Sequence, residues 1–295
     1  MKFKGLLMSA LLFVASGAQA ADVLKPFILA SKAAGTVAET STQVKGKLTA
    51  AGFTVVGEYA PFAGANIIIV TNDAMKQNAA ASDAGAYGAA QRVSVTEANK
   101  EIQVSYTNPT YMAKVYRMKG DLAGVSAALG AALGKVEEFG AKGLTAKELG
   151  KYHYMMSMPY FDDQDELAEY GSYQEAVQAV DTKLSSNANG VKKVFRIDVP
   201  GKEESVFGVA MKGGGANPLA DDKFIMSTID FQPIKSTAHL PYEVIVKGKK
   251  VYAFSAKFRI ALSFPDLSMM GANSFMKIKE CPGAIESVLQ NTVKK

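Results

Sequence analysis

The stretches GFTVVGEYAP, at residues 52–61, and GVKKVFRIDVP, at residues 190–200, occupy matching places in the chain and predict its fold. Each follows a helical pattern that ends at a glycine, and each precedes a short apolar strand, a polar insertion and a β-hairpin. A repeat of this length has to be recognised before the individual elements are interpreted. The match predicts an α+β protein of two tandem, similar domains, each an antiparallel sheet covered by helices.

The two predicted domains should be related by a pseudo-two-fold axis, because copies of a domain that pairs with itself tend to keep the symmetric contact within one chain. We place the first domain at residues 21–145 and the second at residues 146–295, after a leader at residues 1–20. The alternative is a pair of unrelated α+β domains that share ordinary turn chemistry.

Helix signals recur in both copies. Thr36 and Ser172 are predicted N-caps, each with a glutamate three residues later, the pattern of a capping box. Gly52 and Gly190 follow these two helices and favour their ends. Thr145 is a third predicted N-cap, next to the expected domain boundary.

The remaining pattern predicts the strands. We expect single strands at residues 26–31, 53–59, 66–71, 153–158, 191–199 and 205–211, and hairpins at residues 92–107 and 242–260. Each hairpin is expected to run on to a proline, Pro109 or Pro265, before a short helix. The acidic run at residues 162–166 is predicted to be a solvated turn, because it lacks the glycine and the distal glutamate of a calcium loop.

The first twenty residues have the three parts of a secretory signal peptide. Lys2 and Lys4 provide the positive region, residues 6–16 are apolar or small, and Ala18-Gln19-Ala20 is a cleavage signature. Residue 21 is not a cysteine, which excludes a lipid anchor at that junction. The sequence therefore predicts an exported protein of a periplasm, with full secretion left open, and no later segment is apolar for long enough to span a membrane.

The composition limits the functions that the protein can have. The formal net charge of the whole chain is +5, and removal of the two leader lysines lowers it. The charged residues are also scattered along the sequence. A net charge that is small and dispersed argues against nucleic-acid binding. Cys281 is the only cysteine, so both halves must be held by their cores without an internal disulfide. We expect Cys281 to be a small buried side chain rather than a reactive thiol.

Short motifs in both copies resemble one known family, the domain-of-unknown-function family three-hundred-and-two (DUF302), small α+β domains with an antiparallel sheet covered by helices. The first copy carries Gly52-Phe53-Thr54-Val55, Arg92-Val93-Ser94-Val95 and Ser105-Tyr106-Thr107-Asn108-Pro109 before Met112, and the second carries Gly190-Val191, Tyr242-Glu243-Val244-Ile245-Val246 and Ser263-Phe264-Pro265 before Met269. The cysteine-proline motif of some members is absent from the insertions. The resemblance implies a fold and dimer-like pairing, within a monomer or in a homodimer, and no reaction.

The pattern favours a non-catalytic periplasmic binding or accessory protein without a cofactor. We expect its ligand, a small apolar molecule or a partner protein, to sit between the halves and under the insertions. The residues expected to line that site are Tyr111, Met112, Phe224, Met226 and Phe231, with plain core packing as the alternative for each. The run Gly213-Gly214-Gly215 lacks the Lys-Ser or Lys-Thr pair of a phosphate loop and is expected to be a hinge.

Two other classes of function stay open. A copper-handling protein would use His153 and Met155, since thioether and imidazole ligands suit Cu(I). A hydrolase or isomerase would be centred on His239, with Glu243 expected on the same strand face and Arg259 expected nearby on the paired strand. The alternatives are methionine as core filler and a structural, hydrogen-bonded trio.

Overall fold

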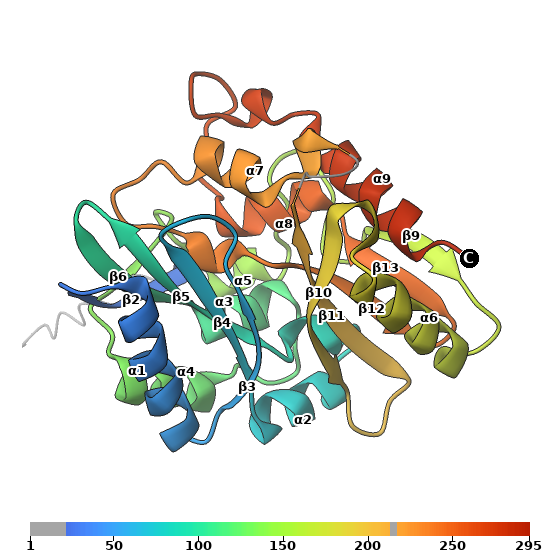
Figure 1. Ribbon diagram of the computed structural model, residues 1–295, viewed down its shortest axis with the longest axis horizontal. Coiled ribbons are helices and arrows are strands. Elements are labelled where there is room, and N and C mark those ends of the chain that lie inside the picture. Colours follow the sequence, from blue (N-terminus) through green and yellow to red (C-terminus); the bar gives the residue numbers. More distant parts are fainter. Residues whose placement is uncertain (1–21, 213–216) are drawn as a thin grey trace, which may run out of the picture.

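The structure is a computed structural model that describes residues 22–212 and 217–295 (Figure 1). Two antiparallel sheets lie between two outer layers of helices. The chain is therefore α+β, as the sequence predicts. The predicted leader and the glycine run at residues 213–215 lie outside the described residues.

The two main sheets share one strand order. The first sheet runs β3 (Thr54–Tyr59), β4 (Ala65–Thr71), β5 (Gln91–Ala98), β6 (Glu101–Thr107), β2 (Phe27–Ala33) and β7 (Glu137–Phe139). The second runs β10 (Val191–Asp198), β11 (Glu204–Met211), β12 (Tyr242–Lys247), β13 (Lys250–Phe254) and β9 (Gln164–Glu169). A separate pair joins β1 (Val23–Leu24) to β8 (Leu144–Thr145). In both sheets the first strand in sequence therefore pairs with the fifth, and β7 is an addition to the first sheet alone.

The β-bulges match as well. The bulged residues of β2 and β9 are Ala30 and Leu167, each the fourth residue of its strand. The bulged residues of β3 and β10 are Val56 and Val194, and each comes four residues after the glycine that follows the preceding helix. Bulges bend a strand and increase its twist, so the matched bulges give the two sheets similar local shapes.

Helices cover one face of each sheet. The first half contains α1 (Val37–Ala50), α2 (Asp73–Ala81), η1 (Gly85–Gly88), α3 (Pro109–Val115) and α4 (Ala123–Leu133), and α5 (Ala146–Leu149) lies just past the predicted domain boundary. The second contains α6 (Tyr173–Ser185), η2 (Ala188–Gly190), η3 (Pro218–Ala220), α7 (Asp222–Ile229), η4 (Thr237–His239), α8 (Ala256–Ser263), η5 (Phe275–Lys277) and α9 (Cys281–Val293). Helices α1 and α4 pack on the first sheet, and α6 and α9 on the second. The predicted N-caps Thr36, Ser172 and Thr145 are confirmed, and Thr145 with Glu148 makes both bonds of a capping box.

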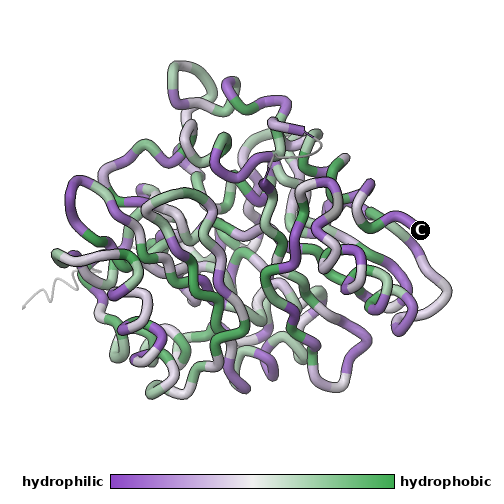
Figure 2. Tube along the Cα trace, viewed as in Figure 1, coloured by the Kyte–Doolittle hydropathy of each residue, from purple (hydrophilic) through white to green (hydrophobic). Residues whose placement is uncertain are grey.

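The other faces of the two sheets are turned toward each other. Strands β4 and β11 are buried along nearly their whole length, which fits strands covered on both faces. Figure 2 shows the hydrophobic residues concentrated along these inner strands, while hydrophilic residues dominate the outer loops. Fully buried side chains such as Leu48 and Val244 contribute about 1.5–3 kcal/mol each to stability.

Polar side chains fill much of the layer between the sheets, which we call the seam. The seam consists of Arg92, Ser94, Thr96, Gln103, Ser105 and Thr107 from β5 and β6 of the first half, with Glu204, His239, Glu243 and Arg259 from the second, and all of them are buried. The short helices of the insertions enter the seam reciprocally: η4 packs on β4, β5 and β6, and η1 packs on β11 and β12.

One predicted strand and one predicted turn are wrong. Residues 153–158 form turns, and the first strand of the second sheet is β9, which begins inside the acidic run predicted to be a turn. Tertiary contacts hold this segment in place of sheet pairing: the hydroxyl groups of Tyr152 and Tyr154 donate to the carbonyl oxygens of Ala261 and Leu267. Strand β9 was missed because it is a polar edge strand, held to β13 by pairs such as Lys250 with Glu166.

The end of the second hairpin also differs. Strand β13 stops at Phe254, and the predicted remainder of that strand lies in α8. Seven of the eight residues of α8 are buried, so its apolar pattern does not show a helical period. Pro109 is the first residue of α3, whereas Pro265 follows α8, so the two prolines are not equivalent.

Within residues 22–212 and 217–295, no helix combines the length and the apolar character that a bilayer crossing requires.

A glycine at the contact between β3 and β10 provides a stability test. A Cβ atom on Gly57 would lie 2.4 Å from the Val194 carbonyl oxygen, a backbone atom that cannot rotate away. We expect Gly57→Ala to lower the free energy of unfolding by about 1–3 kcal/mol, the usual cost of overpacking. Urea denaturation followed by circular dichroism measures it.

Gly46→Ala is the matched control. Gly46 lies on the exposed face of α1 with open space around the added Cβ, so the substitution should stabilise the protein by about 0.5–1 kcal/mol. Equal effects of the two substitutions would contradict the close approach of β3 and β10.

Candidate functional site

The most concentrated polar chemistry lies in the middle of the seam. The Arg92 guanidinium forms an ion pair with the Glu243 carboxylate, and both side chains are about 1% exposed. Arg259 Nε lies 3.3 Å from the other oxygen of the same carboxylate. The buried carboxylate of Glu243 therefore pairs with two buried guanidinium groups.

Arg92 and Glu243 hold the same place in their two sheets. In the first sheet Gly57 faces Ile69, which faces Arg92. In the second sheet Phe195 faces Gly208, which faces Glu243. The matched residues Arg92 and Glu243 touch one another across the seam, and a Cβ on Gly57 would lie 3.1 Å from the Cβ of its counterpart Phe195.

His239 is held as a neutral base inside this cluster. A guanidinium can only donate, so Arg259 Nη1 donates to His239 Nδ1 at 3.1 Å. The proton is therefore on Nε2, which lies 3.3 Å from the Tyr242 hydroxyl oxygen. Burial, and then the positive charges of Arg259 and Arg92, hold the pKa of His239 well below its ordinary value. The structure brings His239, Glu243 and Arg259 together in a fully buried, hydrogen-bonded arrangement, but His239 lies in η4 and Arg259 in α8 rather than on the paired strands that the sequence predicts.

A second buried ionisable group, Asp222 at the start of α7, links the two halves. The Tyr59 hydroxyl of the first half donates to Asp222 Oδ2 of the second half at 2.6 Å, and the Met211 amide donates to the same oxygen at 2.9 Å. Asp222 Oδ1 is buried and accepts no hydrogen bond from the described residues. Burial raises the pKa of this carboxyl to about 7.

The insertions add hydrogen bonds across the seam. The Ala86 amide of η1 donates to Glu204 Oε1 at 2.7 Å, and the Thr96 hydroxyl of β5 donates to the Thr237 hydroxyl of η4 at 3.0 Å. The ring of Tyr87 also stacks on Phe254, with centroids 3.5 Å apart. These contacts fix the relative position of the halves.

One pocket opens between the halves beside the edge strand β7, and we call it the β7 pocket. It has a volume of about 690 Å³. Its walls come from Lys25, Lys32 and residues 137–142 of the first half, and from Ile229, Asp230, residues 232–234, Ser236, Phe264 and Asp266 of the second. The pocket therefore lies under the second insertion and takes walls from both halves. The accessible surface of the pocket is mainly apolar, although seven of its lining residues are charged, and pockets of this volume are typical small-molecule sites.

Asp230 is the most buried ionisable group of the β7 pocket, with 9% of its surface exposed. It ends α7, where Oδ1 accepts a hydrogen bond from the Ser236 amide at 2.9 Å. Burial raises the pKa of this carboxyl to about 6.

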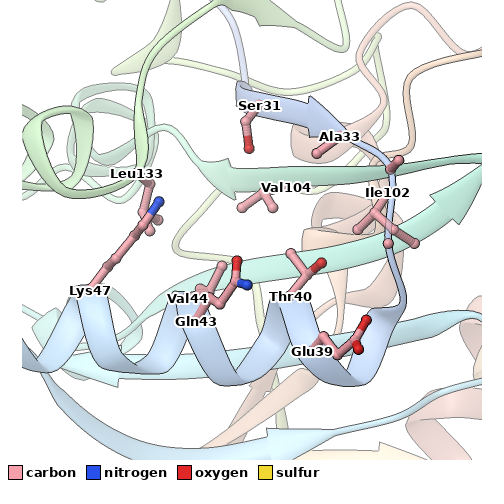
Figure 3. A pocket seen from close by; sticks show the side chains of 12 residues that line it. Ser31, Ala33, Glu39, Thr40, Gln43, Val44, Lys47, Ile102, Val104 and Leu133 are labelled. Atoms are coloured by element: carbon pink, nitrogen blue, oxygen red, sulfur yellow. The ribbon is translucent and has the colours of Figure 1, made fainter.

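Two other pockets are less suited to bind a small molecule. The pocket in Figure 3, of about 560 Å³, lies within the first half between α1 and the β2–β6 part of the sheet. Its charged side chains, Glu39 and Lys47, are exposed ones on α1. A further pocket, of about 630 Å³, lies where β3 meets β10 and carries the largely exposed lysines Lys192 and Lys212.

The five residues expected to line a ligand site are dispersed. Tyr111, Met112 and Met226 are buried, and the Tyr111 hydroxyl donates to the Leu262 carbonyl oxygen across the seam at 2.8 Å. Phe224 and Phe231 lie in the second insertion with 40% and 46% of their surfaces exposed. The β7 pocket is lined by the immediate neighbours of Phe231 instead.

The expected metal ligands lie on the surface turn at residues 153–158. His153 Nδ1 lies 2.8 Å from the Met155 carbonyl oxygen, and the imidazole ring packs on Tyr160. The Met155 side chain is 43% exposed. Cys281, at the start of α9, is buried as expected, and burial raises the pKa of its thiol to about 11.

Sequence reasoning missed the residues of the β7 pocket. The segment Ile229-Asp230-Phe231 could have indicated the site. A single carboxylate within an apolar run is unusual unless it ends a helix or faces a site. Phe139 and Phe264, which come from the two halves, carried no signal, because only the fold brings them to one pocket.

Comparison of the chain with protein-family models, with curated protein sequences and with solved structures finds no match.

Because one buried carboxylate pairs with two guanidinium groups, two substitutions should destabilise the protein to different extents. Glu243→Gln leaves two buried guanidinium groups without a counter-charge, and we expect it to lower the free energy of unfolding by about 3–5 kcal/mol. Arg92→Met leaves Glu243 paired with Arg259 and should cost less than half as much. Urea denaturation at pH 7 measures both, and the reverse order would show that the ion pair does not govern this contact.

The raised pKa of Asp222 predicts a pH dependence of stability. The pKa is about 7 in the folded protein against an ordinary value of 3.8, so the folded state binds more protons between these pH values. The free energy of unfolding should therefore decrease as the pH rises from about 4 to about 7. Asp222→Asn should remove the part of this pH dependence that Asp222 contributes. The free energy of unfolding of the variant, measured over the same pH range by urea denaturation, is subtracted from that of the wild type to obtain this part. An unchanged slope would contradict the raised pKa of Asp222.

Proposed function

We propose that this protein is an exported, non-catalytic binding protein whose small, mainly apolar ligand sits in the β7 pocket. The observation that carries the proposal is the place of that pocket: its walls come from both halves, under the second insertion. The leader at residues 1–20 supports export to a periplasm.

We also propose that the two halves are copies of one domain, related by a pseudo-two-fold axis and similar to the DUF302 domains. The shared strand order and the matched bulges support this. The reciprocal packing of η1 and η4 and the contact between Arg92 and Glu243 support it further, because a two-fold axis brings equivalent residues together.

The state of the histidines favours binding over catalysis. The chain has two histidines. His239 is fully buried, and its Nδ1 accepts from Arg259. His153 lies on a surface turn, with Nδ1 next to a backbone carbonyl oxygen. A general base has to reach the proton that it removes, and the buried His239 does not.

A neutral fluorescent probe tests the proposal. N-phenyl-1-naphthylamine brightens in apolar surroundings and carries no charge at pH 7.5. We expect saturable binding to the wild type and at least tenfold weaker binding to Ala141→Trp, because an indole at this half-buried position would occupy the β7 pocket. The chain has no tryptophan of its own, so the emission of the new indole also reports whether it is buried.

Ala38→Trp is the matched control. Ala38 lies on the exposed face of α1, outside the β7 pocket, so this variant should bind the probe as the wild type does. Binding that is unaffected by Ala141→Trp, or no binding at all, would overturn the β7 pocket as the ligand site.

A further inference from the structure

The chemistry of the β7 pocket centres on the Asp230 carboxylate. The groups around it are apolar or on the rim: Phe139 and Phe264 are buried, while Lys32, Glu137 and Asp266 are exposed. A buried carboxylate is costly unless a cation or several hydrogen-bond donors stabilise it. The partners of Asp230 therefore indicate what the pocket lacks.

Those partners leave the carboxylate without a salt bridge. The Ser236 amide donates to Oδ1, and Lys235 Nζ donates to the backbone carbonyl oxygen of Asp230 at 3.0 Å. Among the described residues, no lysine or arginine forms a salt bridge with the Asp230 carboxylate, and no hydrogen bond to Oδ2 is found. A charged acceptor thus remains in the wall of a largely apolar pocket.

The charges of the rim do not replace that missing cation. Lys25, Lys32 and Lys142 line the pocket together with Glu137, Glu138 and Asp266, so the rim is balanced. Glu138 is engaged by Lys135 Nζ at 2.8 Å, and Asp266 accepts from the Lys142 amide at 2.7 Å. The net charge of the pocket is then set by Asp230.

We propose that the ligand of the β7 pocket is an organic cation, a protonated amine on an apolar or aromatic body. This inference rests on the proposed binding function and names its ligand class. The ammonium group pairs with Asp230, and the body packs against Phe139, Ile234 and Phe264. Charge-assisted hydrogen bonds in such surroundings are about twice as strong as neutral ones, and aromatic walls add attraction for a cation.

The proton affinity of Asp230 adds a pH dependence. The pKa of this carboxyl is about 6, raised by burial and opposed by the Ser236 amide and by Lys235. The other charged groups that face the pocket are Lys25, Lys32, Lys142, Glu137, Glu138 and Asp266. Affinity for the cation should decline as the pH falls through about 6, because the carboxyl becomes neutral while the amine stays charged.

Three ligands of one shape test the inference on the full chain. The probes are 1-naphthylmethylamine, its neutral counterpart 1-ethylnaphthalene and the anion 1-naphthylacetate, each used to displace N-phenyl-1-naphthylamine at pH 7.5. We expect the amine to bind at least about tenfold more tightly than the neutral compound, a difference of about 1.4 kcal/mol, and the anion to bind most weakly. The preference should shrink at pH 5.

Asp230→Asn should abolish the preference for the amine and leave the affinity for 1-ethylnaphthalene unchanged, because the amide oxygen still accepts from Ser236. Asp266→Asn removes the same charge from the exposed rim of the same pocket and should change the preference less than about twofold, since exposed charges are screened.

The outcomes separate the inference from the proposed function. If the neutral compound binds as tightly as the amine, or if Asp266→Asn has the same effect as Asp230→Asn, the ligand class is wrong while the binding site stands. If none of the probes binds and Ala141→Trp has no effect, the proposed function itself fails.

Discussion

The buried ion pair between Arg92 and Glu243 governs how the two halves meet. Both residues occupy the same place in their sheets, yet they carry opposite charges. With the two-fold axis that we propose, two copies of the first half would place two arginines together, and two copies of the second would place two glutamates together. Removing one partner of a buried pair, or facing it with a like charge, costs several kcal/mol. The unlike charges therefore favour pairing of the first half with the second over pairing of like halves.

The remaining contacts of the seam depend on that pairing. Arg259 shares the Glu243 carboxylate and in turn holds His239, so the histidine is oriented by the ion pair rather than by solvent. The hydrogen bonds of η1 and η4 add further links between the halves. The buried charges of the seam favour one geometry, because a shift of the sheets would separate Glu243 from both arginines.

The β7 pocket is a consequence of this geometry. Its walls come from β7 and the following loop in the first half, and from the end of α7 and the loop after α8 in the second. Neither half contains the whole pocket, so its shape depends on the seam. The two buried clusters also differ in chemistry. In the seam the carboxylate of Glu243 pairs with two arginines, whereas in the pocket the carboxylate of Asp230 forms no salt bridge with any described residue. The first arrangement supports structure, and the second is suited to a ligand.

The sequence by itself determined the local elements that its own short-range chemistry controls. The N-caps at Thr36, Ser172 and Thr145, the glycines after the two main helices and the order of the elements are all visible in residues close to one another in the chain. The same reasoning failed where burial overrides local pattern. Helix α8 is buried on nearly every side, and β9 is a polar edge strand whose partner β13 is about 85 residues away.

The tertiary structure alone decided the long-range placements. The approach of His239, Glu243 and Arg259 was expected from one hairpin, but the contact of Glu243 with Arg92 was not, because 151 positions separate the two residues in the chain. The β7 pocket likewise brings Phe139 and Phe264 together from different halves. Local patterns record which face of an element is apolar, whereas pockets and buried ion pairs arise from the way whole sheets pack, and that packing leaves no signal within a short window of sequence.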